Sequence, residues 1–246
     1  MSRAAALIFA VVAYAIFFAT FLYLIAFVGD LSIAPRTVDV GPDSPLATAV
    51  AIDVALIALF GLQHSVMARQ GFKRWWTRFV PRPAERSVYV LAASLALIVL
   101  MGLWRPIDTI VWNVGDPLVS DLIWVVFWLG WGMVLLSTFL LNHFELFGLQ
   151  QAWFYARGRE ASPPEFRQPL FYRWIRHPLY LGFFIAFWAA PEMTAGHLLL
   201  AAGMSVFMLI AIQYEEKDLV AWFGKDYEDY RERAGMLLPR FRRRSL

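Results

Sequence analysis

The first apolar segment of the chain, Ala4 to Val28, carries no charged side chain over 25 residues. A helix rises about 1.5 Å per residue, so roughly 20 apolar residues cross the roughly 30 Å hydrocarbon core of a bilayer. The segment is too long for the core of a signal peptide, and no small-residue cleavage site follows it. It therefore predicts a retained transmembrane helix.

Further apolar segments cover residues 47–67, 88–103, 122–141, 178–190 and 198–213. Hydrophobic residues make up 60% of the chain, against about 45–50% in soluble domains, which is more than one soluble core can use. The fold class we expect is all-α: a single polytopic membrane helical bundle over residues 1–246 with five to six membrane segments. Because the 178–190 run is short, the last two segments are expected to form a tight hairpin turning near Pro191 and Gly196.

Charge is distributed unevenly between the connecting segments. Residues 68–87 and the C-terminal tail are basic, with Arg69, Lys73, Arg74, Arg78, Arg82, Arg86, Arg231, Arg233, Arg240, Arg242, Arg243 and Arg244. Residues 29–46 and 105–121 are acidic, with Asp30, Asp39, Asp43, Asp108, Asp116 and Asp121. Because basic loops stay in the cytoplasm, both termini are expected to be cytoplasmic, with the protein in the inner (cytoplasmic) membrane.

The same charge pattern bears on partners. The basic stretches flank membrane segments, so contact with anionic membrane lipid explains them and no nucleic-acid binding is expected. Cysteine is absent, which excludes disulfides, zinc–thiolate sites and a cysteine nucleophile. With only four histidines, no histidine-rich metal centre is expected. Polar residues instead gather on the predicted cytoplasmic side, in residues 62–69, 142–177 and 213–233.

The sequence Arg176-His177-Pro178 opens the 178–190 segment. Proline suits the first turn of a helix, where free N–H groups and the helix dipole favour an anion. Arg176 could add a bidentate clamp, so this position could hold a ligand carboxylate at the interface. The tripeptide fits a marker of the headgroup boundary equally well. Just inside the helix, Gly182 would permit close approach of either a ligand or another helix.

Glu215 and Glu216 directly follow the last apolar segment. A carboxylate there could accept two hydrogen bonds from a ribose diol, or it could balance the charge of nearby arginines. Beyond it, aromatic and aliphatic residues recur at helical spacing and predict a C-terminal amphipathic cytosolic helix; they are Leu219, Phe223, Tyr227 and Tyr230. Its apolar face could be packed, lie on lipid, or cover a cofactor pocket.

Taken together, these motifs resemble the isoprenylcysteine carboxyl methyltransferase superfamily of membrane methyltransferases. The shared features are the RHPLY motif at 176–180, a hydrophobic hairpin, the Glu-Glu pair, and FGKDYEDY at 223–230. The match covers about the last third of the chain. Earlier segments, LQHSVMAR at 62–69 and NHFELFGLQQAW at 142–153, narrow the resemblance to the bacterial methanethiol S-methyltransferases of its NnrU-like branch.

The resemblance implies an enzyme that uses S-adenosyl-L-methionine to methylate a small thiol, methanethiol to dimethyl sulfide, by in-line transfer. Glu215 would bind the polar end of the cofactor, with Glu216 as a helper. The other implied cofactor contacts are Gln150, Gln151, Trp153, Arg176, His177, Tyr180, Gly182, Tyr227 and Tyr230. No strand-linked glycine fingerprint of a Rossmann methyltransferase is present, and Gly130 and Gly132 lie in an apolar helix and are expected to serve packing.

A thiol must lose its proton to become a good nucleophile, which a nearby base would assist. His64 and His143 both lie at predicted inner ends of membrane segments and are the catalytic candidates; either could instead tie helices together. We favour His64, because Gln63 and Ser65 beside it form a polar cluster in an apolar helix. Two alternatives remain open: carboxyl methylation of a prenylated cysteine, and a non-enzymatic NnrU-like transport protein.

Overall fold

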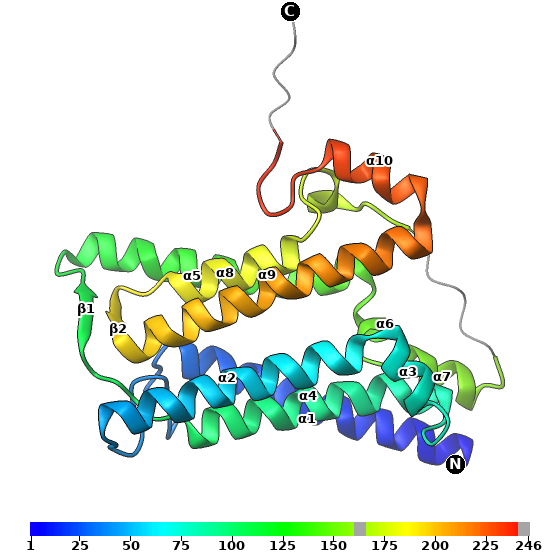
Figure 1. Cartoon of the computed structure of the whole chain (residues 1–246), viewed down its shortest axis with the longest axis horizontal. Coiled ribbons are helices and arrows are strands. Elements are labelled where there is room, and N and C mark those ends of the chain that lie inside the picture. Colours follow the sequence, from blue (N-terminus) through cyan, green and yellow to red (C-terminus); the bar gives the residue numbers. More distant parts are fainter. Residues whose placement is uncertain (160–165, 241–246) are drawn as a thin grey trace, which may run out of the picture.

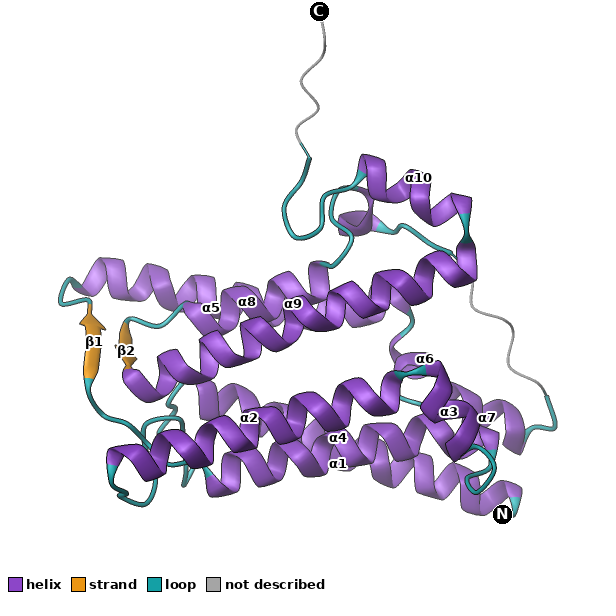
Figure 2. Cartoon of the chain, in the orientation of Figure 1, coloured by secondary structure: helices purple, strands orange, loops and turns teal. Residues whose placement is uncertain are grey.

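The structure, a computed structural model, describes residues 1–159 and 166–240 (Figure 1, Figure 2). Its elements are α1 (Arg3–Val28), α2 (Leu46–Ala68), α3 (Gln70–Trp76), α4 (Arg82–Leu103), β1 (Ile110–Asn113), α5 (Pro117–Leu141), α6 (His143–Leu146), α7 (Leu149–Ala156), η1 (Leu170–Arg173), α8 (Pro178–Trp188), β2 (Glu192–Thr194), α9 (Ala195–Phe223) and α10 (Lys225–Arg233). The predicted all-α class is confirmed. The predicted basic anchors Arg242, Arg243 and Arg244 lie outside the described residues.

Among the described residues, five helices are long and apolar enough to cross a membrane: α1, α2, α4, α5 and α9. The sixth predicted segment is α8, whose 11 residues span only about 16 Å. Extended chain after α8 continues to the end of the bundle that holds β1 and β2, where α9 begins (Figure 1). The protein is therefore a polytopic membrane bundle, in which the N-terminus and α10 lie at the same end.

The helices form two layers (Figure 1). One layer contains α1, α2 and α4, and the other contains α5, α8 and α9; α2 packs against α9 between them. The shared core is apolar, with Phe27, Leu100, Trp104, Phe127 and Phe187 among its fully buried side chains. The site described below lies at the end of this bundle where α9 leads into α10.

Gly182 lies at the crossing of α8 and α5. A Cβ atom added to Gly182 would lie 2.8 Å from the Gly130 carbonyl oxygen and 2.8 Å from the Val134 nitrogen. A Cβ atom on Gly130 would meet the Ala186 nitrogen at 2.7 Å. Gly130 and Gly182 therefore let two backbones approach closely, which confirms packing for Gly130. The same expectation is wrong for Gly132, which is exposed and has no atom within 4 Å of an added Cβ atom. Of the two roles that the sequence allowed for Gly182, close approach to another helix is the one seen in the structure. Contact of Gly182 with a cofactor stays a prediction.

Replacing Gly182 with Ala is expected to lower the free energy of unfolding by about 1–3 kcal/mol, because the new methyl group overpacks a backbone contact. Gly132→Ala is the matched control, since no atom lies within 4 Å of a Cβ atom at this exposed position on α5. Thermal unfolding of the detergent-solubilised variants measures both effects. Equal melting temperatures for Gly182→Ala and the wild type would contradict the packing role.

The end of the bundle opposite α10 is closed by a two-stranded ribbon that the sequence did not predict. Strands β1 and β2 pair antiparallel, with Ile110 opposite Thr194. The Thr194 hydroxyl donates to Asp39 at 2.5 Å, which joins the 29–45 loop to the ribbon. Asp53, fully buried in α2, accepts the backbone N–H of Arg105 at 2.9 Å. The α8–β2–α9 connection confirms the predicted hairpin.

The predicted amphipathic helix is divided into two pieces. Helix α9 continues through the two glutamates to Phe223, and the chain then turns at Gly224, whose φ of +53° is a conformation that glycine adopts readily. Helix α10 follows, with Tyr227 and Tyr230 buried on one face. Phe166, from the segment before η1, packs on this face, so the aromatic side is covered by protein.

Candidate functional site

The entrance to α8 is held by the segment that follows α10. The backbone N–H of Arg176 donates to the Gly235 carbonyl at 2.8 Å, and that of His177 donates to Met236 at 3.1 Å. The Tyr230 hydroxyl donates to the Tyr172 carbonyl at 2.5 Å. Burial raises the pKa of Tyr230 to about 12, so its hydroxyl remains a donor at neutral pH. Helix α10 is therefore fastened to the start of α8.

Arg176 and His177 bind a carboxylate that belongs to the protein itself. Arg176 Nε donates to Glu216 Oε1 at 2.6 Å, and His177 Nε2 lies 3.1 Å from the same oxygen. Arg231 from α10 reaches Glu216 Oε2 at 3.2 Å. Arg176 also donates to the Ala234 carbonyl at 2.5 Å. Since Glu216 is buried and has three cationic or N–H partners, it joins α8, α9 and α10.

Glu215, the neighbouring carboxylate, is held differently. It is only partly buried, and the Tyr180 hydroxyl donates to its Oε2 atom at 3.0 Å. No residue in the described part of the chain donates a hydrogen bond to its second oxygen, Oε1. With no donor among the described residues, Oε1 can accept hydrogen bonds from a ligand.

Tyrosines from four elements lie within electrostatic range of Glu215: Tyr89 of α4, Tyr172 of η1, Tyr180 of α8 and Tyr227 of α10. Burial, and after it the charges of Glu216 and Glu215, raise the pKa of Tyr227. Its buried hydroxyl has no hydrogen-bond partner among residues 1–159 and 166–240. The Tyr227 hydroxyl is therefore a buried, neutral donor that a bound ligand could satisfy by supplying an acceptor.

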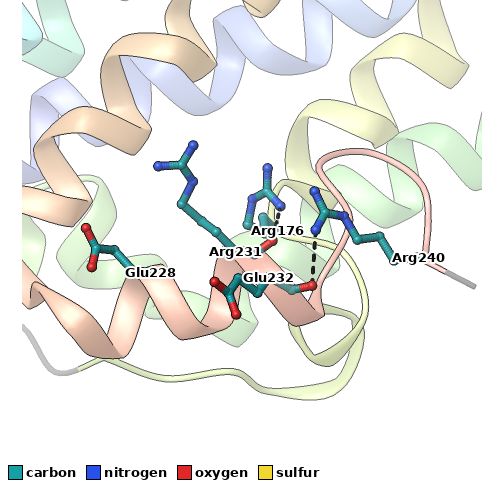
Figure 3. A pocket seen from close by; sticks show the side chains of 5 residues that line it. All are labelled: Arg176, Glu228, Arg231, Glu232 and Arg240. Atoms are coloured by element: carbon teal, nitrogen blue, oxygen red, sulfur yellow. Dashed lines mark hydrogen bonds between the residues drawn. The ribbon is translucent and has the colours of Figure 1, made fainter. Parts of the chain in front are cut away.

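A cavity of about 310 Å³ opens beside Arg176 and Arg231, the two arginines that bind Glu216, and is shown in Figure 3. Its lining is charged and consists of Arg176, Glu228, Arg231, Glu232 and Arg240. In Figure 3, Arg231 and Arg240 lie on either side of Arg176. Both signs of charge are present, which suits a ligand group that carries both an ammonium and a carboxylate.

His64 lies on α2, in the other layer of helices, and contacts Tyr89, which is within electrostatic range of Glu215. Its Nε2 atom is 2.8 Å from the Tyr89 hydroxyl. The rings of Phe60 and Phe207 flank the imidazole, with centroids 5.3 and 5.8 Å away. The Nδ1 atom is buried and has no hydrogen-bond partner in the described residues. His64 thus has one nitrogen fixed by the protein and the other available.

The sequence is similar to those of known methyltransferases over nearly its whole length. Methanethiol S-methyltransferase 1 of Bradyrhizobium diazoefficiens is 51% identical over 234 residues, covering 95% of this chain and 82% of the relative. The methanethiol S-methyltransferase of Mycobacterium tuberculosis is 51% identical over 239 residues, covering 97% and 98% respectively. The chain belongs to the methanethiol S-methyltransferase family. The resemblance inferred from the motifs is thereby confirmed.

A more distant relative of this family member is the protein Nurim of Xenopus laevis. The two are 29% identical over 181 residues, which cover 69% of this chain and 62% of Nurim. No family model matches the chain. No solved structure matches it either.

In this methanethiol S-methyltransferase family member, His143 has both ring nitrogens occupied. Its Nε2 atom is 2.8 Å from the Tyr14 hydroxyl, and its Nδ1 atom is 2.8 Å from Thr138 Oγ1. Phe139 stacks on its ring at 4.3 Å. Burial lowers the pKa of His143, which keeps the ring neutral. These contacts favour a role in joining α1, α5 and α6, so His64 is the better placed of the two candidate bases.

The candidates on α7 lie in the layer of α1 and α4, against which α7 packs (Figure 1). Gln150 accepts from the Asn142 side chain at 2.6 Å, and Gln151 donates to the Glu145 carbonyl at 3.1 Å. Trp153 is exposed, with the Arg157 guanidinium 4.6 Å from its ring centroid. Their contacts are thus local, and the structure does not join them to Glu216; their contact with a cofactor stays a prediction.

The sequence motifs of this family member did not indicate two residues of the site. Tyr89 and Tyr172 both lie near Glu215, yet neither belongs to the motifs that indicated the site. Tyr89 is a hydroxyl-bearing side chain one residue into a predicted apolar segment and three residues after Arg86. That polar position at the end of a membrane helix was the available signal.

Proposed function

We propose that the protein methylates methanethiol to dimethyl sulfide, with S-adenosyl-L-methionine as the methyl donor. The observation that supports this most directly is identity of about 50% over nearly the whole chain to relatives named methanethiol S-methyltransferase. We place the reaction at the cytoplasmic face of the inner membrane, with both termini cytoplasmic. The basic segments that surround α3 and α10 support this orientation.

The residues around Glu215 fit such a donor. The free Oε1 atom of Glu215 can accept a ribose hydroxyl, and the unpartnered Tyr227 hydroxyl can donate to an acceptor. The charged cavity at Arg231 and Arg240 suits the amino acid portion of the donor. When bound, the sulfonium supplies a methyl group that a nucleophile can attack directly. Arg176, His177 and Glu216 would hold the wall of this site in place.

On this proposal, the protein has three tasks in the reaction. It orients the thiol sulfur in line with the methyl group, which lowers the entropic part of the barrier. It excludes water from the base, because the rings of Phe60 and Phe207 flank His64. Its base, His64, accepts the thiol proton: even the cysteine thiol, with a reference pKa of about 8.5, is largely protonated at neutral pH, and a simple alkyl thiol is a weaker acid. Methanethiol, small and apolar, can enter from the lipid.

The test uses the full-length protein in detergent or lipid nanodiscs, with labelled S-adenosyl-L-methionine and a panel of thiols. Dimethyl sulfide detected in the headspace above methanethiol is the expected result. A prenylated cysteine and a reaction without thiol serve as parallel samples. Methylation of the prenylated cysteine alone would support the carboxyl methyltransferase alternative. Failure to methylate any small thiol would overturn the proposal, and failure to bind the donor at all would favour a transport protein.

A further inference from the structure

The pair formed by His64 and Tyr89 suggests how the thiol is activated. We propose that Tyr89 is a positioning residue that holds His64 in the tautomer able to accept the thiol proton, and that it connects this base to Glu215. The inference rests on the proposed thiol methylation and adds a residue that the family motifs do not include. Four observations support it: one hydrogen bond, one unpartnered nitrogen, one nearby carboxylate and a contrasting pair elsewhere in the chain.

The direction of the Tyr89–His64 hydrogen bond decides which nitrogen of His64 can accept a proton. A neutral imidazole carries one N–H, so one nitrogen donates and the other accepts. If Nε2–H donates to the Tyr89 oxygen, 2.8 Å away, Nδ1 carries the lone pair. Nδ1 is the buried atom that has no hydrogen-bond partner in the described part of the chain. A thiol that enters this position would supply the missing donor.

The nearby carboxylate is Glu215 of α9, which acts electrostatically on Tyr89 of α4 in the other layer of helices. Tyr89 lies within electrostatic range of Glu215 and of Tyr180, whose hydroxyl donates to Glu215. With its oxygen accepting from His64, the Tyr89 O–H can point its proton towards this negative group. The other charged groups that act on Tyr89 are Arg86, Arg69 and Glu85. Arg86 is held in place because its Nε atom donates to the Leu146 carbonyl at 2.7 Å.

In the proposed step, the thiol transfers its proton to His64 before the methyl group moves. The S–H bond of the thiol breaks and its proton moves to His64 Nδ1, giving an imidazolium that still donates from Nε2 to Tyr89. The thiolate forms the new S–C bond while the bond between the methyl group and the sulfonium sulfur breaks, and that electron pair remains on the sulfur of the donor. The imidazolium then releases its proton to solvent. Tyr89 neither gains nor loses a proton overall.

A second tyrosine–histidine pair in the chain provides a matched control. Tyr14 lies 2.8 Å from His143 Nε2, the same separation as in the Tyr89–His64 pair. There, however, Nδ1 is already bonded to Thr138, so no substrate proton can be accepted. Tyr14→Phe and Tyr89→Phe therefore each remove one tyrosine–histidine hydrogen bond at the Nε2 atom of a packed histidine. Only Tyr89→Phe should affect the ionisation of the thiol.

The experiment measures turnover and donor affinity for Tyr89→Phe, Tyr14→Phe, His64→Ala and the wild type in nanodiscs. We expect Tyr89→Phe to lower kcat for methanethiol about tenfold, and His64→Ala to lower it roughly 100-fold. The Kd for the donor, measured by calorimetry, should stay within about twofold in both. The deficit should shrink as the pH rises towards the pKa of the thiol. It should also shrink with trifluoroethanethiol, a small thiol that ionises more readily.

The outcomes separate this inference from the proposed function. If the wild type methylates no thiol, the proposed function itself fails. If the wild type is active and Tyr89→Phe matches Tyr14→Phe in kcat, pH profile and thiol dependence, the positioning role is overturned. A Tyr89→Phe deficit of equal size for both thiols at every pH would indicate lost packing only, and it would also overturn the inference.

Discussion

Glu216→Ala is expected to lower the free energy of unfolding by about 3–5 kcal/mol, because it leaves the buried Arg176 charge without its carboxylate. His177 and Arg231 lose the same partner. All three come from elements that Glu216 joins, so α10 should separate from the start of α8. Thermal or denaturant unfolding in detergent measures the loss, and limited proteolysis after α9 should detect the released segment.

Asp218→Ala is the matched control for this prediction. Asp218 lies on the same helix and pairs with Arg69 at 3.5 Å, but both side chains are about a third exposed. Exposed ion pairs contribute only about 0–1 kcal/mol, so the control should unfold close to the wild type. Comparable losses in the two variants would mean that the Glu216 cluster contributes no more than a surface pair.

Glu215→Gln, at the neighbouring position, is expected to weaken donor binding and to leave stability nearly unchanged. Stability should stay near that of the wild type, because the amide oxygen of Gln can still accept from the Tyr180 hydroxyl. Affinity for S-adenosyl-L-methionine should fall about 10-fold to 100-fold, since a hydrogen bond to a charged group contributes about 1.5–3 kcal/mol. Calorimetry with the donor alone gives the Kd, and circular dichroism with heating gives the stability.

Asp229→Asn provides the control for charge alone. Asp229 is an exposed acid on α10, so the variant removes one negative charge from the same end of the protein. Its donor affinity should match the wild type. If both variants weaken donor binding equally, the effect comes from the general field of the protein, and Glu215 has no specific contact.

The two adjacent glutamates show where sequence reasoning reached its limit. The Glu-Glu pair and the Arg-His-Pro motif together indicated a site, and the structure does bring the two motifs together. Which glutamate faces a ligand depends on the direction of each side chain along α9. Neighbouring residues on a helix point about 100° apart, so Glu216 turns to Arg176 while Glu215 turns to Tyr180. A rotation of α9 by about 100° would exchange these roles, and the sequence of the helix does not specify that rotation.

The two candidate bases were distinguished in the same way. His64 and His143 have similar sequence settings, each at the end of an apolar segment with polar neighbours. The structure separates them by the second ring nitrogen, which Thr138 occupies in His143 and which has no partner in His64 among the described residues. Thr138 is only five residues from His143, but whether its hydroxyl reaches Nδ1 depends on how the chain turns between α5 and α6.

The sequence by itself determined the class of fold, the position of each span and the end of the bundle where polar groups gather. These features are local, because a membrane helix satisfies its own backbone hydrogen bonds and needs only sufficient apolar length. Only the tertiary structure decided the partners: Glu216 with Arg176, Gly182 with Gly130, and Tyr89 with His64. These pairs join residues at least 25 positions apart, and such contacts depend on how the helices pack around a shared core.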